Sequence, residues 1–128
     1  MNEAVSHAIE ELRATYPDAQ ISADPDDDGG AYVVMEPLLV GGLYTYETSW
    51  VGFRITFQYP YADIYPHFVR PDLQRRDGRP LGDGMSSGHN FVGRAAIQLS
   101  RRSNRLNPAM DTAALKLAKV LQWLATHP

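Results

Sequence analysis

The sequence predicts an α+β protein in which helices pack on one face of an antiparallel sheet. Three observations support this class. A helical repeat of apolar residues lies near each end of the chain, strand-like alternation lies between them, and turn-forming residues separate the strands. Strands that follow one another in a run, with helices at the ends, are typical of this class rather than of alternating α/β folds. The length of 128 residues fits a single domain over residues 1–128.

The first 16 residues are predicted to form an amphipathic helix. Its apolar face consists of Val5, Ile9, Leu12 and Tyr16. The spacings of four, three and four residues place these side chains on the same side of a helix. Pro17 ends the helix, because proline has no amide hydrogen to donate and restricts the conformation of the preceding residue.

Four strands are predicted to follow as an antiparallel meander joined by hairpins. Their ranges are about 19–23, 31–39, 50–57 and 67–70. The third strand is the clearest, because apolar residues alternate with other residues from Val51 to Phe57. Asp24–Gly30 and Gly41-Gly42 supply the turn residues on either side of the second strand.

Two segments between this meander and the end of the chain have weaker patterns. Residues 72–88 hold four glycines, three arginines and few apolar residues, so we predict an exposed loop there. Residues 91–99 are predicted to be a short strand or an extended segment packed on the core. We expect Trp50 and Trp123 to lie in the core.

The chain is predicted to end in a long helix. Asn107 is a suitable N-cap, and Pro108 suits the first helical position. The predicted apolar stripe consists of Met110, Ala114, Leu117, Leu121 and Leu124. Lys116, Lys119 and Gln122 are expected to face water.

Composition and charge narrow the classes of function. The net charge of -3 argues against a general nucleic-acid binder, since such proteins present a basic surface to phosphates. No apolar run approaches the roughly 18–20 residues that a membrane span needs, and the N-terminus lacks a secretory signal pattern, so we expect a cytoplasmic protein. The chain has no cysteine, which excludes disulfides, thiolate metal sites and a cysteine nucleophile.

One motif runs from His89 to Pro108. It contains His-Asn-Phe-Val-Gly-Arg-Ala-Ala-Ile-Gln-Leu-Ser and, further on, Leu-Asn-Pro. In ubiquitin-conjugating enzymes a His-Pro-Asn sequence lies eight residues before the nucleophilic cysteine, and the proline of a Trp-x-Pro sequence lies ten residues after that cysteine. Gln98 follows Asn90 by eight residues and precedes Pro108 by ten. Phe53–Phe57, followed by a Tyr-Pro pair, is similar to the family's third strand and Tyr-Pro element.

The chain therefore resembles the ubiquitin-conjugating-enzyme-like (UBC-like) superfamily, in particular its short, divergent bacterial members. The resemblance implies a UBC-like fold of an N-terminal helix, a four-stranded antiparallel meander and a C-terminal helix packed on the sheet. Asn90 matches the family's oxyanion-stabilising asparagine, and Gln98 occupies the cysteine position. The proline of His-Pro-Asn is missing here, and two Tyr-Pro pairs, Tyr59-Pro60 and Tyr65-Pro66, compete for the family's single element.

An amide is not a nucleophile for thioester transfer, so the resemblance implies a noncatalytic member. Such a protein would act as a binding or scaffold subunit in a bacterial ubiquitin-like modification pathway, some of which serve antiviral defence. Its expected partner is a ubiquitin-like protein or an activating-enzyme-like protein, with no membrane partner and no cofactor, and the net acidity disfavours nucleic acid.

Two groups of residues are candidates for contacts with that partner. The first group is Arg94, Arg101, Arg102 and Arg105, which surround the Gln98 segment. Guanidinium groups recognise anionic groups in a bidentate, planar manner, although a solvated patch with carboxylate neighbours is the alternative. The second group is Tyr59, Tyr61 and Tyr65. These side chains could form an aromatic surface for a partner, or simply pack over the end of the sheet.

Other functions remain as alternatives. An enzyme could use a site near His89 and Asn90, although the nearby serines show no evident His-Asp arrangement in the sequence. The chain could also be a peptide-binding module unrelated to ubiquitin. The histidines show no metal-ligand spacing. The acidic segment at residues 24–29 matches the first half of a calcium loop but has Met35 where the bidentate glutamate belongs, so we favour a solvated turn.

Overall fold

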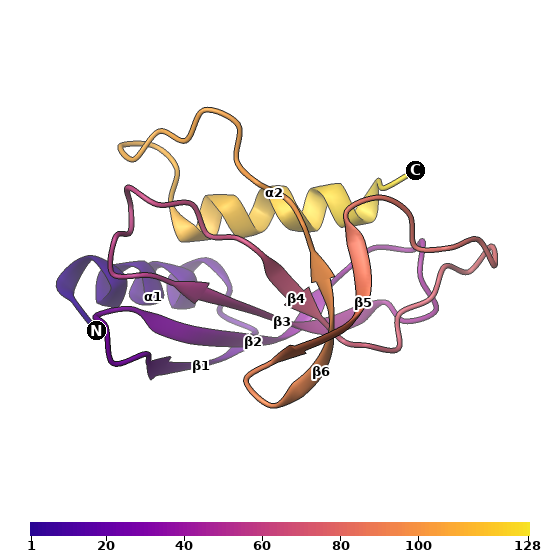
Figure 1. Cartoon of the computed structure of the whole chain (residues 1–128), viewed down its shortest axis with the longest axis horizontal. Coiled ribbons are helices and arrows are strands. Elements are labelled where there is room, and N and C mark those ends of the chain that lie inside the picture. The colour runs from indigo at the N-terminus through magenta and orange to yellow at the C-terminus, as the bar shows by residue number, and fades with distance from the viewer.

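A computed structural model describes residues 1–128 and shows an α+β fold, as the sequence predicts. The elements in chain order are α1 (Glu3–Thr15), β1 (Gln20–Pro25), β2 (Ala31–Leu39), β3 (Thr48–Ile55), β4 (His67–Val69), β5 (Met85–Phe91), β6 (Arg94–Leu99) and α2 (Ala113–Ala125). The strands form one sheet in the order β1-β2-β3-β4-β6-β5, and all neighbours are antiparallel (Figure 1). The predicted meander corresponds to β1 to β4, but the count of four strands is wrong because β5 and β6 extend the sheet.

α1 forms where the apolar spacing predicted a helix. The side chain of Asn2 caps its N-terminus by accepting a hydrogen bond from the Val5 amide at 2.9 Å. The buried residues of α1 are Val5, Ala8, Ile9 and Leu12. The helix ends at Thr15, before Pro17, because proline cannot continue the hydrogen-bond ladder.

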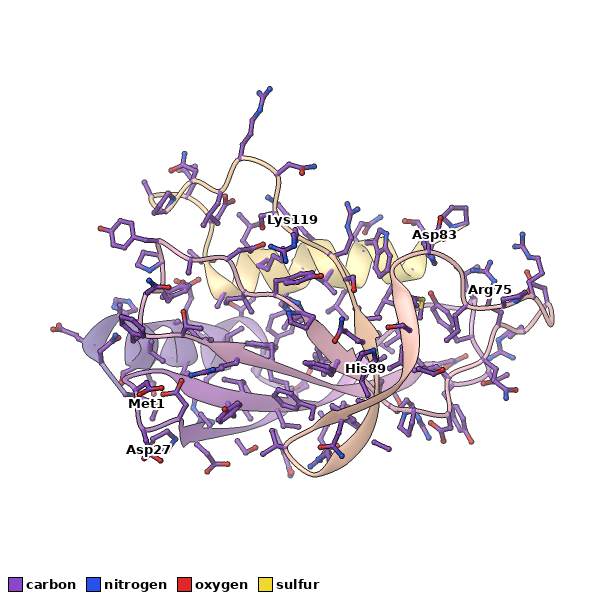
Figure 2. The ribbon with its side chains drawn as sticks, in the orientation of Figure 1. Met1, Asp27, Arg75, Asp83, His89 and Lys119 are labelled. Atoms are coloured by element: carbon purple, nitrogen blue, oxygen red, sulfur yellow. The ribbon has the colours of Figure 1, made fainter.

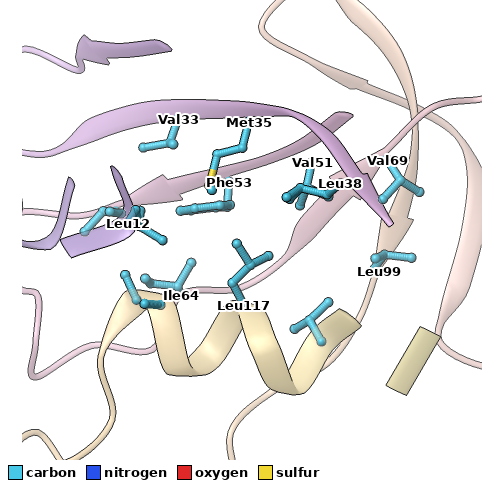
Figure 3. Close-up of a cluster of buried hydrophobic side chains, with 14 of the residues drawn as sticks. Leu12, Val33, Met35, Leu38, Val51, Phe53, Ile64, Val69, Leu99 and Leu117 are labelled. Carbon is cyan, nitrogen blue, oxygen red and sulfur yellow. The ribbon is translucent and has the colours of Figure 1, made fainter. Parts of the chain in front are cut away.

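The helices pack against one face of the sheet only. In β3, Val51, Phe53 and Ile55 are buried beneath the helices, and the intervening side chains point to the opposite face, which we call the outer face. Figure 3 shows Leu12 of α1 and Leu117 of α2 directed at Phe53 and its neighbours. The core formed in this way contains 24 buried apolar residues.

The two tryptophans are half-buried instead of lying in the core. Trp50 belongs to the outer face of β3, where the Arg94 guanidinium lies 5.2 Å from the centroid of its ring. Trp123 lies on α2 at the margin of the core, with its ring 4.5 Å from that of His127. Indole rings are large, so partial burial at a margin is common for this residue.

β5 and β6 form a hairpin whose turn the sequence pattern did not show. Val92 and Gly93 adopt φ of 49° and 82°, the pair of positive φ values of a type I′ turn. This turn divides the single extended segment that was predicted over residues 91–99. Valine is uncommon at positive φ, so the sequence did not indicate a turn at this position. The hairpin folds over the outer face, where Phe91 stacks on Phe68 with ring centroids 4.9 Å apart.

Gly52 makes this close approach of the hairpin possible. A Cβ atom at that position would lie 2.5 Å from the Phe91 ring. No other residue type could occupy this place on β3 without moving the aromatic ring.

The segment predicted as an exposed loop, residues 72–88, is anchored at several points. Leu73 and Arg75 are buried, and Arg75 Nη1 donates to the His127 carbonyl at 3.2 Å. Met85 is also buried and begins β5. The prediction of a wholly exposed loop is therefore wrong at its ends, because tertiary contacts with the C-terminal residues bury a guanidinium that a sequence pattern counts as exposed.

α2 begins later than predicted. Its N-cap is Thr112, whose side chain accepts from the Leu115 amide, and Asn107 instead begins a separate turn closed by Asp111. Met110 is 67% exposed and does not belong to the apolar stripe. Lys119 faces water as predicted, but Lys116 is only 7% exposed, so that prediction is wrong. Neither helix has the length and apolar character needed to cross a membrane.

Candidate partner-binding surface

Asn90 and Gln98, the two positions matched to the conjugating-enzyme motif, do not meet in the structure. Asn90 pairs with Ala95 across the hairpin, and Gln98 lies three residues further along β6. Cross-strand partners share a face and an odd separation changes the face, so the two amides point to opposite sides of the sheet. Asn90 Oδ1 accepts from the Gly93 amide at 3.0 Å and thereby closes the hairpin turn.

Gln98 belongs to the outer face and has Phe68 on one side and Ser86 on the other. Its Nε2 donates to Ser100 Oγ at 3.3 Å. Next to it, a register shift in β5 brings Ser86 Oγ within 2.9 Å of His89 Nε2. His89 is therefore hydrogen-bonded to a serine that the sequence did not single out as its partner, and both side chains are exposed.

The four candidate arginines divide into two groups. Arg94 lies in β6 beside the outer face, where its guanidinium is 5.2 Å from the Trp50 ring centroid and 3.8 Å from a Glu36 carboxylate oxygen. The other three lie after β6, on residues 100–106, which we call the Arg-rich segment. Arg94 consequently belongs to a different surface, and its charge already has a carboxylate neighbour.

The Arg-rich segment lies against residues 59–66, which we call the Tyr-Pro loop, although about 40 residues separate them in the chain. Arg102 stacks over the Tyr65 ring, 4.2 Å from its centroid. A hydrogen bond to Ser100, aided by the charge of Arg102, lowers the pKa of the Tyr65 hydroxyl. Two of the segments predicted to contact a partner thus form one continuous surface.

A buried polar network fastens these two segments to α2. Lys116 Nζ donates to the Arg101 carbonyl at 2.7 Å, to Ser103 Oγ at 2.9 Å and to Asp63 Oδ2 at 3.2 Å. Ser103 donates to Asp63 through both its amide, at 2.7 Å, and its hydroxyl, at 2.8 Å. Every proton of the ammonium group therefore has an acceptor, as a buried charge requires.

The pKa values in this network follow from burial and pairing. Burial lowers the pKa of Lys116, and the carboxylate of Asp63 only partly offsets that effect. Burial would raise the pKa of Asp63, but the hydrogen bonds from Ser103 and the charge of Lys116 outweigh it and hold that pKa below its usual value.

The three candidate tyrosines have different roles. The Tyr59 hydroxyl accepts from the Ala113 amide at 3.0 Å, and burial raises the pKa of that hydroxyl, so Tyr59 holds the start of α2. Tyr65 is half-buried beneath Arg102. Tyr61 is 78% exposed, and Met110 is 67% exposed. Exposed Tyr, Met and Arg side chains are the types enriched where proteins bind one another.

The arginines of the Arg-rich segment have no carboxylate partners. Arg101, Arg102 and Arg105 form no ion pair within 4.0 Å, and all three are exposed. The arginines that do form ion pairs are Arg54, Arg70, Arg75, Arg79 and Arg94. Carboxylates therefore do not neutralise these three guanidinium groups through direct ion pairs.

Positive and negative residues are unevenly distributed along the chain. Residues 84–128 contain six Lys or Arg and a single Asp, whereas residues 1–83 contain six Lys or Arg and fourteen Asp or Glu. An acidic protein thus carries a basic region, and the Arg-rich segment and α2 supply most of it. Such a concentration of one sign steers oppositely charged partners toward that region.

Three residues of the site were missed by sequence reasoning: Asp63, Ser103 and Lys116. The spacing of Lys116 from Ala113, Leu117 and Val120 places it on the buried side of α2, and this pattern could have predicted a buried lysine. Nothing in the local sequence indicates that Asp63 and Ser103 would meet it. Their contacts depend on how two loops cross over the helix.

The acidic turn predicted between the first two strands has a structural role. Asp26 accepts hydrogen bonds from the amides of Asp28 and Gly30 at 2.9 and 2.8 Å and pairs with Arg54 at 2.9 Å. No group of three or more histidine, aspartate or glutamate side chains is placed to hold a metal ion.

Searches against protein-family models, curated proteins and solved structures found no match to this chain.

Proposed function

We propose that this chain is a noncatalytic binding subunit that recognises an acidic partner through the surface formed by the Arg-rich segment and the Tyr-Pro loop. The observation that carries the proposal is the absence of carboxylate partners around Arg101, Arg102 and Arg105, on a segment held in place by a buried network. A fixed surface with unpaired guanidinium groups favours association with anionic groups, because little ordering is needed on binding.

The proposed pathway is a bacterial ubiquitin-like modification pathway, and the resemblance to the UBC-like superfamily extends this proposal to pathways of antiviral defence. The proposed partner is a ubiquitin-like or activating-enzyme-like protein. The order of an N-terminal helix, an antiparallel meander and a C-terminal helix supports the UBC-like reading. The lack of any cysteine supports a noncatalytic member.

Binding to the ubiquitin-like and activating-enzyme-like proteins encoded by neighbouring genes tests this proposal. We expect the Arg102→Glu/Arg105→Glu variant to lose at least tenfold in affinity, measured by calorimetry at physiological salt. Arg76→Glu is the matched control, because Arg76 is also exposed and forms no ion pair but lies in the loop before β5. Failure of every such protein to bind, or equal loss in the control, would contradict the proposal.

A second candidate function rests on the hydrogen bond between Ser86 and His89. In an esterase, His89 would take the hydroxyl proton as Ser86 attacks an ester carbonyl, and would pass it to the alcohol that leaves when the C–O bond of the tetrahedral intermediate breaks. Water would then hydrolyse the acyl-serine to a carboxylic acid and restore the Ser86 hydroxyl. The amide of Gln98 lies opposite Ser86 and could donate to the developing oxyanion. Hydrolysis of a nitrophenyl ester that is abolished by Ser86→Ala and His89→Ala, but kept in Asn90→Ala, would support this activity. Equal rates in all variants would remove it.

A further inference from the structure

A basic pocket of about 220 Å³ lies beside the Arg-rich segment. Residues 101–104 form one wall, and Lys116, Lys119 and Val120 of α2 form the other, with Asp111 at its margin. Figure 2 shows Lys119 on the side of α2 that faces the ascending segment after β6. This pocket is distinct from the outer face, where Gln98 and His89 lie.

The charges around the pocket are unbalanced. Four of its lining side chains are cationic, those of Arg101, Arg102, Lys116 and Lys119, and one is a carboxylate, that of Asp111. The carboxylate is already engaged, since Asp111 accepts from the Asn107 amide at 2.7 Å and lies 3.5 Å from Lys119 Nζ. Asp63 pairs with Lys116 and Asp111 pairs with Lys119, so the excess of positive charge around the pocket comes from Arg101 and Arg102, which form no ion pair.

The wall of the pocket is fixed before any ligand arrives. The buried ammonium of Lys116 holds the Arg101 carbonyl and the Ser103 hydroxyl, at 2.7 and 2.9 Å. The Arg101 guanidinium lies 5.6 Å from the Trp123 ring centroid. Side chains with unused donors, those of Arg101, Asn104 and Lys119, can turn toward the space between them.

The size of the pocket limits what it can hold. A volume of about 220 Å³ equals roughly seven waters at about 30 Å³ each. Pockets for drug-sized ligands begin at about 300 Å³, so a single small anionic group fits better than a nucleotide. Arginine and lysine donors match the oxygens of such a group.

We propose that the basic pocket binds one oxyanion, a phosphate or a carboxylate group, through Arg101, Lys119 and Asn104. This deepens the proposed function, because an acidic side chain of the partner could supply the carboxylate. Free inorganic phosphate is the other source of the same chemistry, and it would bind without a partner.

Titration followed by NMR of the main-chain amides tests the proposal. The probes are inorganic phosphate and a short acetylated tri-glutamate peptide, each added at constant ionic strength maintained with chloride. We expect saturable shifts at residues 101–104 and 116–119, and at least fivefold weaker binding in Arg101→Gln/Lys119→Gln. Tighter binding of the peptide would identify a carboxylate source, and tighter binding of phosphate a free anion; both outcomes support the pocket.

Arg76→Gln is the control and should bind both probes like the wild type, and spectral dispersion confirms that each variant is folded. Shifts that rise linearly with concentration, or that are the same in Arg101→Gln/Lys119→Gln, would overturn the proposal. Saturable phosphate binding without any acidic protein partner would instead contradict the proposed function and leave the pocket standing. Partner binding that is sensitive to Arg102→Glu/Arg105→Glu, with no anion binding, would support the proposed function and contradict the anion-binding pocket.

Discussion

The β5–β6 hairpin and the Arg-rich segment are adjacent in the chain, yet their polar groups are used in different ways. In the hairpin, Asn90 bonds to Gly93, Gln98 to Ser100 and Ser86 to His89, all within three residues in sequence. In the Arg-rich segment, Ser103 bonds to Asp63, which lies 40 residues away.

The difference shows that the region with the motif spacing and the region with side chains available for binding are not the same. Hairpin side chains that cap a turn or bond to a near neighbour contribute to local geometry, and they need no partner to be satisfied. The Arg-rich segment is held by distant contacts through its main chain and Ser103, which leaves its guanidinium groups available. The region with the closer motif spacing is thus the less suited to binding an acidic partner.

The largest expected effect comes from removing the ammonium that fastens the Arg-rich segment. Lys116→Ala leaves the Asp63 carboxylate without its charge partner, so we expect a loss of about 3 kcal/mol in the free energy of unfolding. Urea denaturation measures it. Lys119→Ala, at a site 63% exposed, should cost less than about 0.5 kcal/mol. Equal small losses in both variants would show that the network does not hold the segment.

We expect acid to lower the free energy of unfolding through His67. This side chain is 1% exposed, both ring nitrogens lack partners, and burial together with the charge of Lys116 lowers the pKa of His67 to about 3. The unfolded chain binds a proton below about pH 6.5 and the folded chain does not, so stability falls as pH falls through that value. Between pH 6.5 and 5 the loss should be about 2 kcal/mol.

Urea denaturation at several pH values measures this slope. His67→Leu should flatten it, whereas His7→Gln, at an exposed position of α1, should leave it unchanged. The lowered pKa of Asp63 contributes only below its ordinary value of 3.8, outside this window. A slope that persists in His67→Leu would assign the acid sensitivity to another group.

The hairpin can be displaced without touching the Arg-rich segment. Gly52→Ala places a methyl group against the Phe91 ring, and we expect a loss of about 1.5 kcal/mol from overpacking. A double-mutant cycle with Phe91→Ala measures the coupling, because removing the ring should remove most of the cost of the added methyl. Additive losses would mean that the methyl group and the ring do not interact.

The smallest expected effect is a gain. Val92 has φ of 49° in the hairpin turn, where asparagine is favoured and a β-branched residue is strained. Val92→Asn should therefore raise the free energy of unfolding by about 1 kcal/mol, measured by thermal denaturation, and leave binding to an acidic partner unchanged. A loss of stability would indicate that the exposed valine side chain makes contacts that outweigh the strain.

Local patterns in the sequence predicted much of the fold. The apolar spacing of α1, the alternation in β3 and the turn residues around β2 each depend on neighbours in the chain, and all three predictions are confirmed. The predicted strand count was wrong because the turn between β5 and β6 has a valine at positive φ, which a sequence pattern does not predict. The predicted start of α2 was wrong because Asn107, a suitable N-cap, instead begins a separate turn.

The sequence by itself determined the class of fold, the absence of a thiol nucleophile and the presence of arginines and tyrosines that could face a partner. Only the tertiary structure decided that Asn90 and Gln98 point apart, that Lys116 is buried and that Arg102 stacks on Tyr65. The physical reason is range: periodicity records which face of an element is apolar, whereas partners many residues apart are chosen by how the elements pack.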